Sequence, residues 1–193
     1  MKEDELIDVA FHAVGEKWEK SEYIIYNEED ARGFLVHEIL TILSTNKDYY
    51  GIETSQVHLE MGLPRNTRKR ACDIVIYNDK GGNKANLFAE VKSTAGSTMK
   101  AYKKISQDTL KVSEKIYEEN AATTCVPPNV IIFVSEKDGT GFKSQKKRDG
   151  MVAEIKKDIR ELQIIFRAKT KDNAIIKDVV IKAWVREYGE VKL

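Results

Sequence analysis

The first 45 residues carry hydrophobic positions at the three- and four-residue spacing of amphipathic helices. This pattern predicts one helix over residues 3–19 and a second from Asn27 to about residue 45. Asn27 is a suitable N-cap, and the three acidic residues after it lie where the positive end of a helix dipole favours them. We therefore expect the N-terminal part of the chain to supply two helices, each with one buried face.

Short apolar runs bounded by polar or glycine-bearing segments follow, as is typical of strands. The predicted strands are residues 56–63, 72–77, 86–92, 130–135, 162–167 and 179–186. The segment DKGGN at residues 79–83 has hairpin chemistry, so the strands beside it should be antiparallel neighbours. The run VIIFVS at 130–135 predicts a buried central strand, compatible with parallel pairing.

Helical spacing returns over residues 99–119 and 151–161. Together, these elements predict an α/β protein with three layers, in which a mixed central sheet is flanked by helices. At 193 residues the chain is expected to form a single domain with a substantial core.

Composition limits the function without identifying it. The chain is 41% hydrophobic and 33% charged. Its net charge of +1 means that the overall charge does not indicate a polyanionic partner. It contains no apolar run long enough to cross a membrane, and its N-terminal segment has no apolar signal region. Cys72 and Cys125 do not make a disulfide framework. We expect a cytoplasmic protein with no membrane partner.

Charged residues interrupt the two strands of the predicted hairpin. Asp73 opens the first strand, and Glu90 and Lys92 end the second. Residues i and i+2 of a strand share a face, so Glu90 and Lys92 point the same way, roughly 6.6 Å apart. The antiparallel pairing brings Asp73 to the same end. Two neighbouring carboxylates repel unless a cation lies between them, and that cation can be Lys92 or a divalent metal.

Carboxylates on a strand pair, with the backbone carbonyl of Val91 as a further oxygen, suit Mg²⁺ or Mn²⁺. A metal held there can activate water and neutralise charge on a phosphate, with Lys92 positioning or deprotonating the water or stabilising the transition state. This is the chemistry of phosphodiester hydrolysis. The alternative is a surface salt bridge on a half-exposed hairpin.

Two basic segments, RNTRKR at 65–70 and KSQKKR at 143–148, are either solvated loops or contacts to phosphate. The candidate phosphate-binding residues are Arg65, Arg68, Lys69, Arg70, Lys143, Lys146, Lys147 and Arg148.

The order Asp73, then Glu90-Val91-Lys92, after a helix and a strand, resembles the PD-(D/E)xK nuclease superfamily, which has an αβββαβ core of the restriction-endonuclease-like fold. The chain is most similar to the N-terminal endonuclease domain of type I restriction enzyme R subunits, over residues 28 to about 135. The segments that carry this resemblance are EEDAR at 28–32, VHLE at 57–60, RACDIVIY at 70–77 and FAEVK at 88–92.

The resemblance implies an endodeoxyribonuclease in which Asp73 and Glu90 bind Mg²⁺, or Mn²⁺ in its place, and Lys92 is catalytic. It implies double-stranded DNA as substrate, and modification and specificity subunits of a restriction complex as partners. ATP would act only through a motor domain, and these 193 residues contain no GxxxxGK[ST] loop. We therefore expect an N-terminal fragment of an R subunit. The alternatives are a stand-alone restriction or repair nuclease of the same superfamily and a non-catalytic nucleic-acid-binding module.

Two positions depart from the family pattern. Cys72 stands where proline is usual, and its small side chain is expected to be tolerated. The family often has QxxxY in the next helix, but here Gln107 is followed four residues later by Lys111. Gln107 faces either the site or solvent.

Three further acids are candidate supporting residues. Glu38 falls on the helix face that should be buried, so it needs a partner, which is either the metal site or a lysine. Glu29 is a competing first-helix acid, or a residue that stabilises the helix dipole. Glu60 ends the first strand and either joins the site or is structural. The three histidines show no metal-ligand or triad spacing and are expected to be structural.

Overall fold

The computed structural model describes residues 2–62, 71–77, 85–93, 128–136, 141–170 and 180–192. Its elements are α1 (Lys2–Glu19), α2 (Glu28–Thr45), α3 (Lys47–Tyr50), the 3₁₀ turn η1 (Thr54–Gln56), β1 (Val57–Gly62), β2 (Ala71–Tyr77), β3 (Ala85–Ser93), β4 (Pro128–Val134), α5 (Gln145–Thr170), β5 (Val180–Val185) and β6 (Gly189–Glu190). None of the helices in these ranges is long and apolar enough to cross a membrane.

The strands form a six-stranded mixed sheet in the order β1-β2-β3-β4-β5-β6. β2 pairs antiparallel with β3, which confirms the predicted neighbours, and it also pairs antiparallel with β1. β4 runs parallel to both β3 and β5, and β6 returns antiparallel along β5. β4 is thus the interior parallel strand expected from its continuous apolar run.

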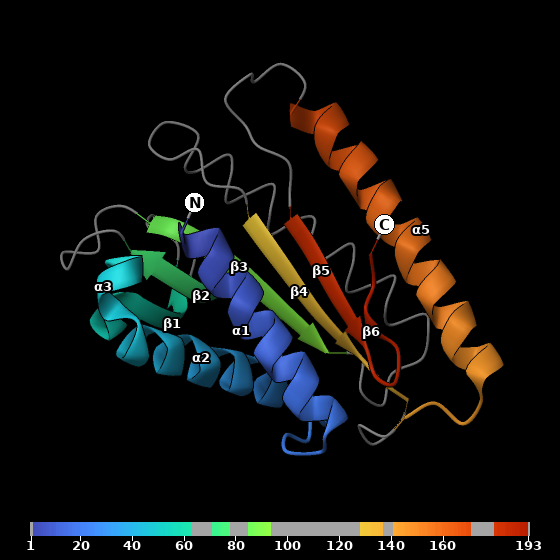
Figure 1. The fold of residues 1–193 in the computed structure, drawn as a ribbon. Helices are drawn as coiled ribbons and strands as arrows, with labels where there is room; N and C mark the ends of the chain where they lie inside the picture. The colour runs from blue at the N-terminus through green and yellow to red at the C-terminus, as the bar shows by residue number, and fades with distance from the viewer. Residues whose placement is uncertain are drawn as a thin grey trace.

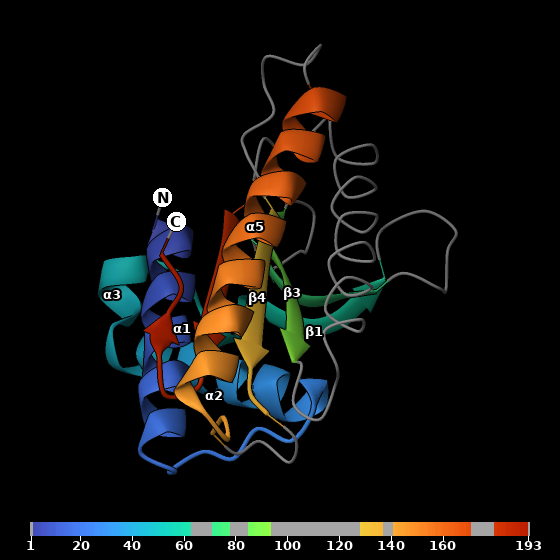
Figure 2. The same cartoon turned by 90° about the vertical axis from the view of Figure 1, so that its right-hand side faces the viewer.

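Helices cover both faces of the sheet, as Figures 1 and 2 show. Ile131 and Phe133 of β4 belong to the core that the sheet forms with α1 and α2. Val130 and Ile132, which alternate with them, belong to the core that the sheet forms with α5. Because successive side chains of a strand point to opposite faces, one apolar run supplies both cores. The architecture is α/β, with a mixed sheet between helices.

The start of α2 follows from local hydrogen bonds. The side chain of Asn27 accepts a hydrogen bond from the backbone N–H of Asp30 over 2.9 Å, and the Asp30 carboxylate accepts one from the N–H of Asn27 over 3.2 Å. This reciprocal capping box satisfies N–H groups that a helix start leaves unpaired. The predicted N-cap is confirmed, and Glu28 becomes the first residue of the helix.

The predicted strand at residues 162–167 is wrong, because this segment continues α5. Val152, Ile155 and Ile159 recur at helical spacing and pack into the core on the α5 side. The following apolar run is not a core strand, since Ile164 is 66% exposed. A short apolar run does not by itself separate helix from strand.

The start of α5 corrects a second expectation. The helix begins at Gln145 and not at residue 151, so much of the basic segment 143–148 is helical and not a loop. The short strand β6 was not predicted. The predicted helix at 99–119 and the hairpin turn at 79–83 lie outside the described residues.

Candidate active site

The pairing of β2 and β3 brings together the three residues that the sequence singles out. Ile74 lies opposite Ala89, and this antiparallel register places Asp73 beside Glu90. Asp73 is 8% exposed and Glu90 is 9% exposed, so two carboxylates are buried at one point of the sheet. The Lys92 ammonium lies 2.7 Å from Glu90 Oε1.

Asp73 contacts a backbone N–H of β3 and a guanidinium of α2. Its Oδ2 accepts a hydrogen bond from the backbone N–H of Val91 over 2.7 Å, which ties β2 to β3. Its Oδ1 lies 3.4 Å from Nη1 of Arg32 on α2. The guanidinium therefore neutralises part of the charge of Asp73.

A second α2 residue reaches the site. Glu28 Oε1 lies 3.0 Å from Nζ of Lys92, so the ammonium lies between Glu28 and Glu90. Glu28 and Arg32 are four residues apart, which puts them on one face of the helix. Sequence reasoning treated Glu28 only as a residue of the helix opening and did not select Arg32. The sequence feature that could have pointed to both residues is their i,i+4 spacing at the start of a capped helix.

The protonation of the site follows from burial and these charges. Burial and the negative charge of Asp73 raise the pKa of Glu90 to about 7, although Lys92 acts in the opposite direction. Burial alone would lower the pKa of Lys92. The negative charges of Glu90 and Glu28, and their hydrogen bonds to the ammonium, outweigh burial and raise this pKa above its ordinary value. Lys92 is thus cationic near neutral pH.

Glu90 also carries the clearest sign of an unmet interaction. Its Oε2 is buried and has no hydrogen-bond partner among the described residues. A buried acceptor without a partner is costly, so it suits a cation or a water that completes the site. The donor set of Asp73 and Glu90 consists of the hard carboxylate oxygens that Mg²⁺ prefers. No group of three or more histidine, cysteine or acidic residues within the described ranges is arranged to bind a metal.

Glu38 takes the second of its two predicted roles, pairing with a lysine. It lies 2.7 Å from Nζ of Lys17 and also accepts a hydrogen bond from the hydroxyl of Tyr23. Burial would raise the pKa of Glu38, but the hydrogen bonds from Lys17 and Tyr23 lower it below its ordinary value. Glu38 therefore has a partner for its buried charge without a metal.

The other supporting candidates are less closely placed. Glu29 is exposed in the first turn of α2, in agreement with a helix-dipole role. The register of β1 and β2 puts the backbone of Glu60 opposite Asp73, because Leu59 pairs with Ile74 and Met61 pairs with Cys72. Gln107 lies outside the described residues.

The structure describes the basic candidates of segment 143–148. Those of segment 65–70 fall outside the described ranges, namely Arg65, Arg68, Lys69 and Arg70. Lys147 lies 2.6 Å from Glu136, and Arg148 donates a hydrogen bond to the backbone carbonyl of Glu187 over 3.0 Å. Lys143 and Lys146 are exposed. Protein contacts thus already engage Lys147 and Arg148, which leaves Lys143 and Lys146 as the better phosphate candidates in this segment.

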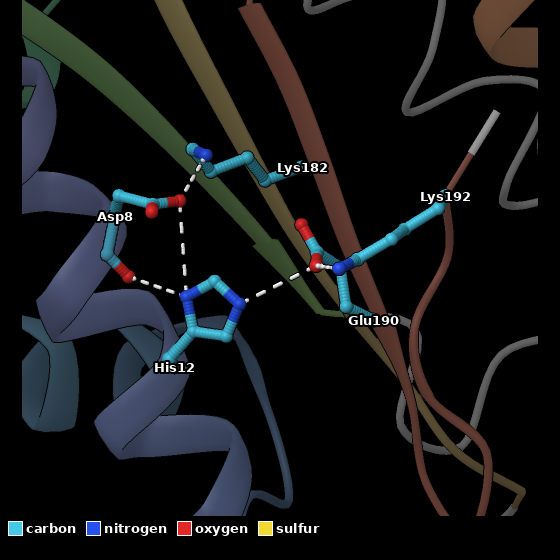
Figure 3. Close-up of polar contacts among 5 residues, drawn as sticks. All are labelled: Asp8, His12, Lys182, Glu190 and Lys192. Carbon is cyan, nitrogen blue, oxygen red and sulfur yellow. Dashed lines mark hydrogen bonds and ion pairs between the residues drawn. The ribbon is translucent and has the colours of Figure 1, made fainter.

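A second polar cluster joins α1 to β5 and β6 (Figure 3). His12 Nε2 lies 3.3 Å from Glu190 Oε2, and His12 Nδ1 lies 2.8 Å from the backbone carbonyl of Asp8. Lys182 pairs with Asp8, and Lys192 lies 3.4 Å from Glu190. Each carboxylate of this cluster already has a lysine partner, which agrees with the structural role expected for His12.

The chain matches no protein-family model, no curated protein and no solved structure.

Proposed function

We propose that the chain is a Mg²⁺-dependent endonuclease domain that hydrolyses phosphodiester bonds of double-stranded DNA. The observation that carries the proposal is the convergence of Asp73, Glu90 and Lys92, with a buried oxygen of Glu90 left without a partner among the described residues. Burying two carboxylates and an ammonium carries a desolvation cost that an ion pair alone often does not repay. They are useful where a cation and a phosphate must be bound together.

Each residue has a distinct role in this proposal. Asp73 and Glu90 would hold the ion, with the backbone carbonyl of Val91 as a further ligand. When bound, the ion supplies charge neutralisation at the phosphate and lowers the pKa of a bound water. The N–H of Val91 keeps the Asp73 carboxylate oriented.

The raised pKa of Lys92 supports one of the roles open to this side chain, that of a hydrogen-bond donor. An ammonium cannot accept a proton from water, so Lys92 acts by donating hydrogen bonds to a phosphate oxygen or to the attacking water. This stabilises the negative charge that develops at phosphorus. Glu28 and Glu90 hold the ammonium in place for this contact.

The restriction-system context comes from the sequence resemblance. The domain would be the nuclease part of a type I restriction R subunit that acts with modification and specificity subunits. Sequence recognition would then lie in another subunit, and this domain would contact backbone phosphates. A stand-alone restriction or repair nuclease would use the same site.

One observation favours a different function, a non-catalytic nucleic-acid-binding module. Arg32 and Lys92 already neutralise Asp73 and Glu90, as they would in a purely structural ion-pair cluster. Metal binding separates these two functions, because the structural cluster has no place for a further cation.

The deciding experiment is a calorimetric titration with Mn²⁺ and Mg²⁺, with plasmid nicking measured in parallel. The variants are Asp73→Asn, which removes the charge at nearly constant shape, and the exposed control Asp48→Asn on α3. We expect the wild type and Asp48→Asn to bind metal and nick DNA, and Asp73→Asn to do neither. If the wild type neither binds metal nor nicks DNA, even when metal and DNA are present together, the chain is a nucleic-acid-binding module and not a nuclease.

A further inference from the structure

The two oxygens of Asp73 have partners of different kinds. Oδ2 is bound by a backbone N–H, which is fixed by the strand pair. Oδ1 faces the guanidinium of Arg32, which ends a long side chain from α2. A cation that reaches Asp73 therefore meets Arg32 at Oδ1.

The Arg32–Asp73 contact is close enough to neutralise charge but is not a tight ion pair. Its 3.4 Å separation exceeds the roughly 2.7–2.9 Å of strong charge-assisted hydrogen bonds. The Arg32 side chain is 20% exposed and the Asp73 side chain is 11% exposed. The Arg32 side chain is thus somewhat more open to solvent than the Asp73 carboxylate.

Glu90 offers the complementary half of a cation site. Its Oε1 is engaged by Lys92, and its Oε2 has no partner among the described residues. A divalent ion at Asp73 and Glu90 would place a second positive charge beside Arg32. Like charges within about 4–6 Å repel each other, so the bound ion would displace Arg32 from Asp73.

We propose that Arg32 is an exchange residue, which neutralises Asp73 before the metal binds and moves to a DNA phosphate when the metal takes its place. This inference rests on the proposed nuclease function. The guanidinium suits the second position because its planar fork of donors matches phosphate oxygens. Metal binding and substrate binding are thereby coupled through one side chain.

The exchange predicts opposite effects of one substitution on two ligands. In Arg32→Gln the competing cation is gone, so Mn²⁺ should bind roughly tenfold more tightly in the absence of DNA. A neighbouring arginine lowers the pKa of a carboxylate by about 1–3 units, and it should oppose a metal ion at the same oxygens in the same direction. DNA affinity in the presence of Ca²⁺, which takes similar oxygen ligands, should fall by roughly tenfold. A residue that merely held Asp73 in place would weaken Mn²⁺ binding when removed.

The experiment combines calorimetry with Mn²⁺ and fluorescence anisotropy of a labelled DNA duplex, on the full chain. Arg160→Gln is the matched control, since it removes an exposed arginine from α5. It should leave Mn²⁺ affinity unchanged. Weaker or unchanged Mn²⁺ binding in Arg32→Gln, or unchanged DNA affinity, overturns the exchange.

A third variant guards against loss of folding. Arg32→Lys keeps the charge but lacks the fork, so its Mn²⁺ affinity should stay within about twofold of the wild type while DNA affinity falls. Equal DNA affinity in Arg32→Lys and the wild type would contradict the phosphate contact. Failure of the nuclease function itself has another signature, because the wild type would then bind no Mn²⁺ at all.

Discussion

The Asp73 carboxylate accepts a hydrogen bond from the backbone N–H of Val91 over 2.7 Å, between two strands that pair antiparallel. The donor, Val91, stands in the sequence between Glu90 and Lys92, the two residues that complete the candidate site. The bond fixes the carboxylate by a backbone group, which no substitution of Val91 other than proline removes. The acid pair is therefore built into the strand pairing and not added at its surface.

The pH dependence of stability should report on Glu90. Its pKa is about 7 in the folded protein against an ordinary value of 4.5, so the folded state binds more protons between these values. The contribution of Glu90 to the free energy of unfolding is then fully present below pH 4.5 and is lost as the pH rises through 7. The free energy of unfolding of the wild type should fall by roughly 3 kcal/mol relative to Glu90→Gln over this range.

Urea denaturation at several pH values measures this difference. Glu16→Gln, which alters an exposed acid on α1, serves as control and should follow the wild type. Parallel pH curves for the wild type and Glu90→Gln would contradict the buried, charge-coupled state of Glu90.

Substitution of Glu28 should affect the reaction more than the fold. Glu28→Gln removes one of the two carboxylates that hold Lys92, and the side chain of Glu28 is 42% exposed. We expect the nicking rate to fall about tenfold, since a hydrogen bond to a charged group is worth about 1.5–3 kcal/mol. Glu29→Gln, one residue further along the same turn, should leave the rate unchanged. Equal rates for the two variants would exclude a role for Glu28.

Substitution of Glu38 should have the opposite outcome. Glu38→Gln weakens the contacts to Lys17 and Tyr23, so the free energy of unfolding should fall by about 1–2 kcal/mol. Mn²⁺ affinity should be unchanged, because these partners account for the buried charge. A loss of Mn²⁺ affinity in calorimetry, with stability intact, would show that Glu38 belongs to the candidate metal site.

The cluster in Figure 3 should contribute little to stability and nothing to metal binding. Glu190→Gln weakens the contacts of His12 and Lys192, of which the Lys192 side chain is 81% exposed. Exposed ion pairs are worth about 0–1 kcal/mol, so thermal unfolding should shift by only a few degrees. A large loss of stability, or altered Mn²⁺ binding, would show that this cluster does more than join α1 to β6.

The central strands and the acid pair could be predicted from the sequence because their signals are local. Hairpin chemistry set β2 against β3, and strand alternation put Glu90 and Lys92 on one face. The capping box at Asn27 likewise depends on residues three positions apart. Such features need no knowledge of the rest of the chain.

The surroundings of the acid pair were decided by the tertiary structure alone. Arg32 and Asp73 are 41 positions apart, Glu28 and Lys92 are 64 apart, and Lys17 and Glu38 are 21 apart. No periodicity links such positions. The structure also decided residues 162–167, where a short apolar run fits either helix or strand and α5 extends through it. The sequence by itself determined which residues could form the site, through local spacing. Only the folded chain determined which charges would neutralise them, because partners for buried charges are chosen by proximity in space.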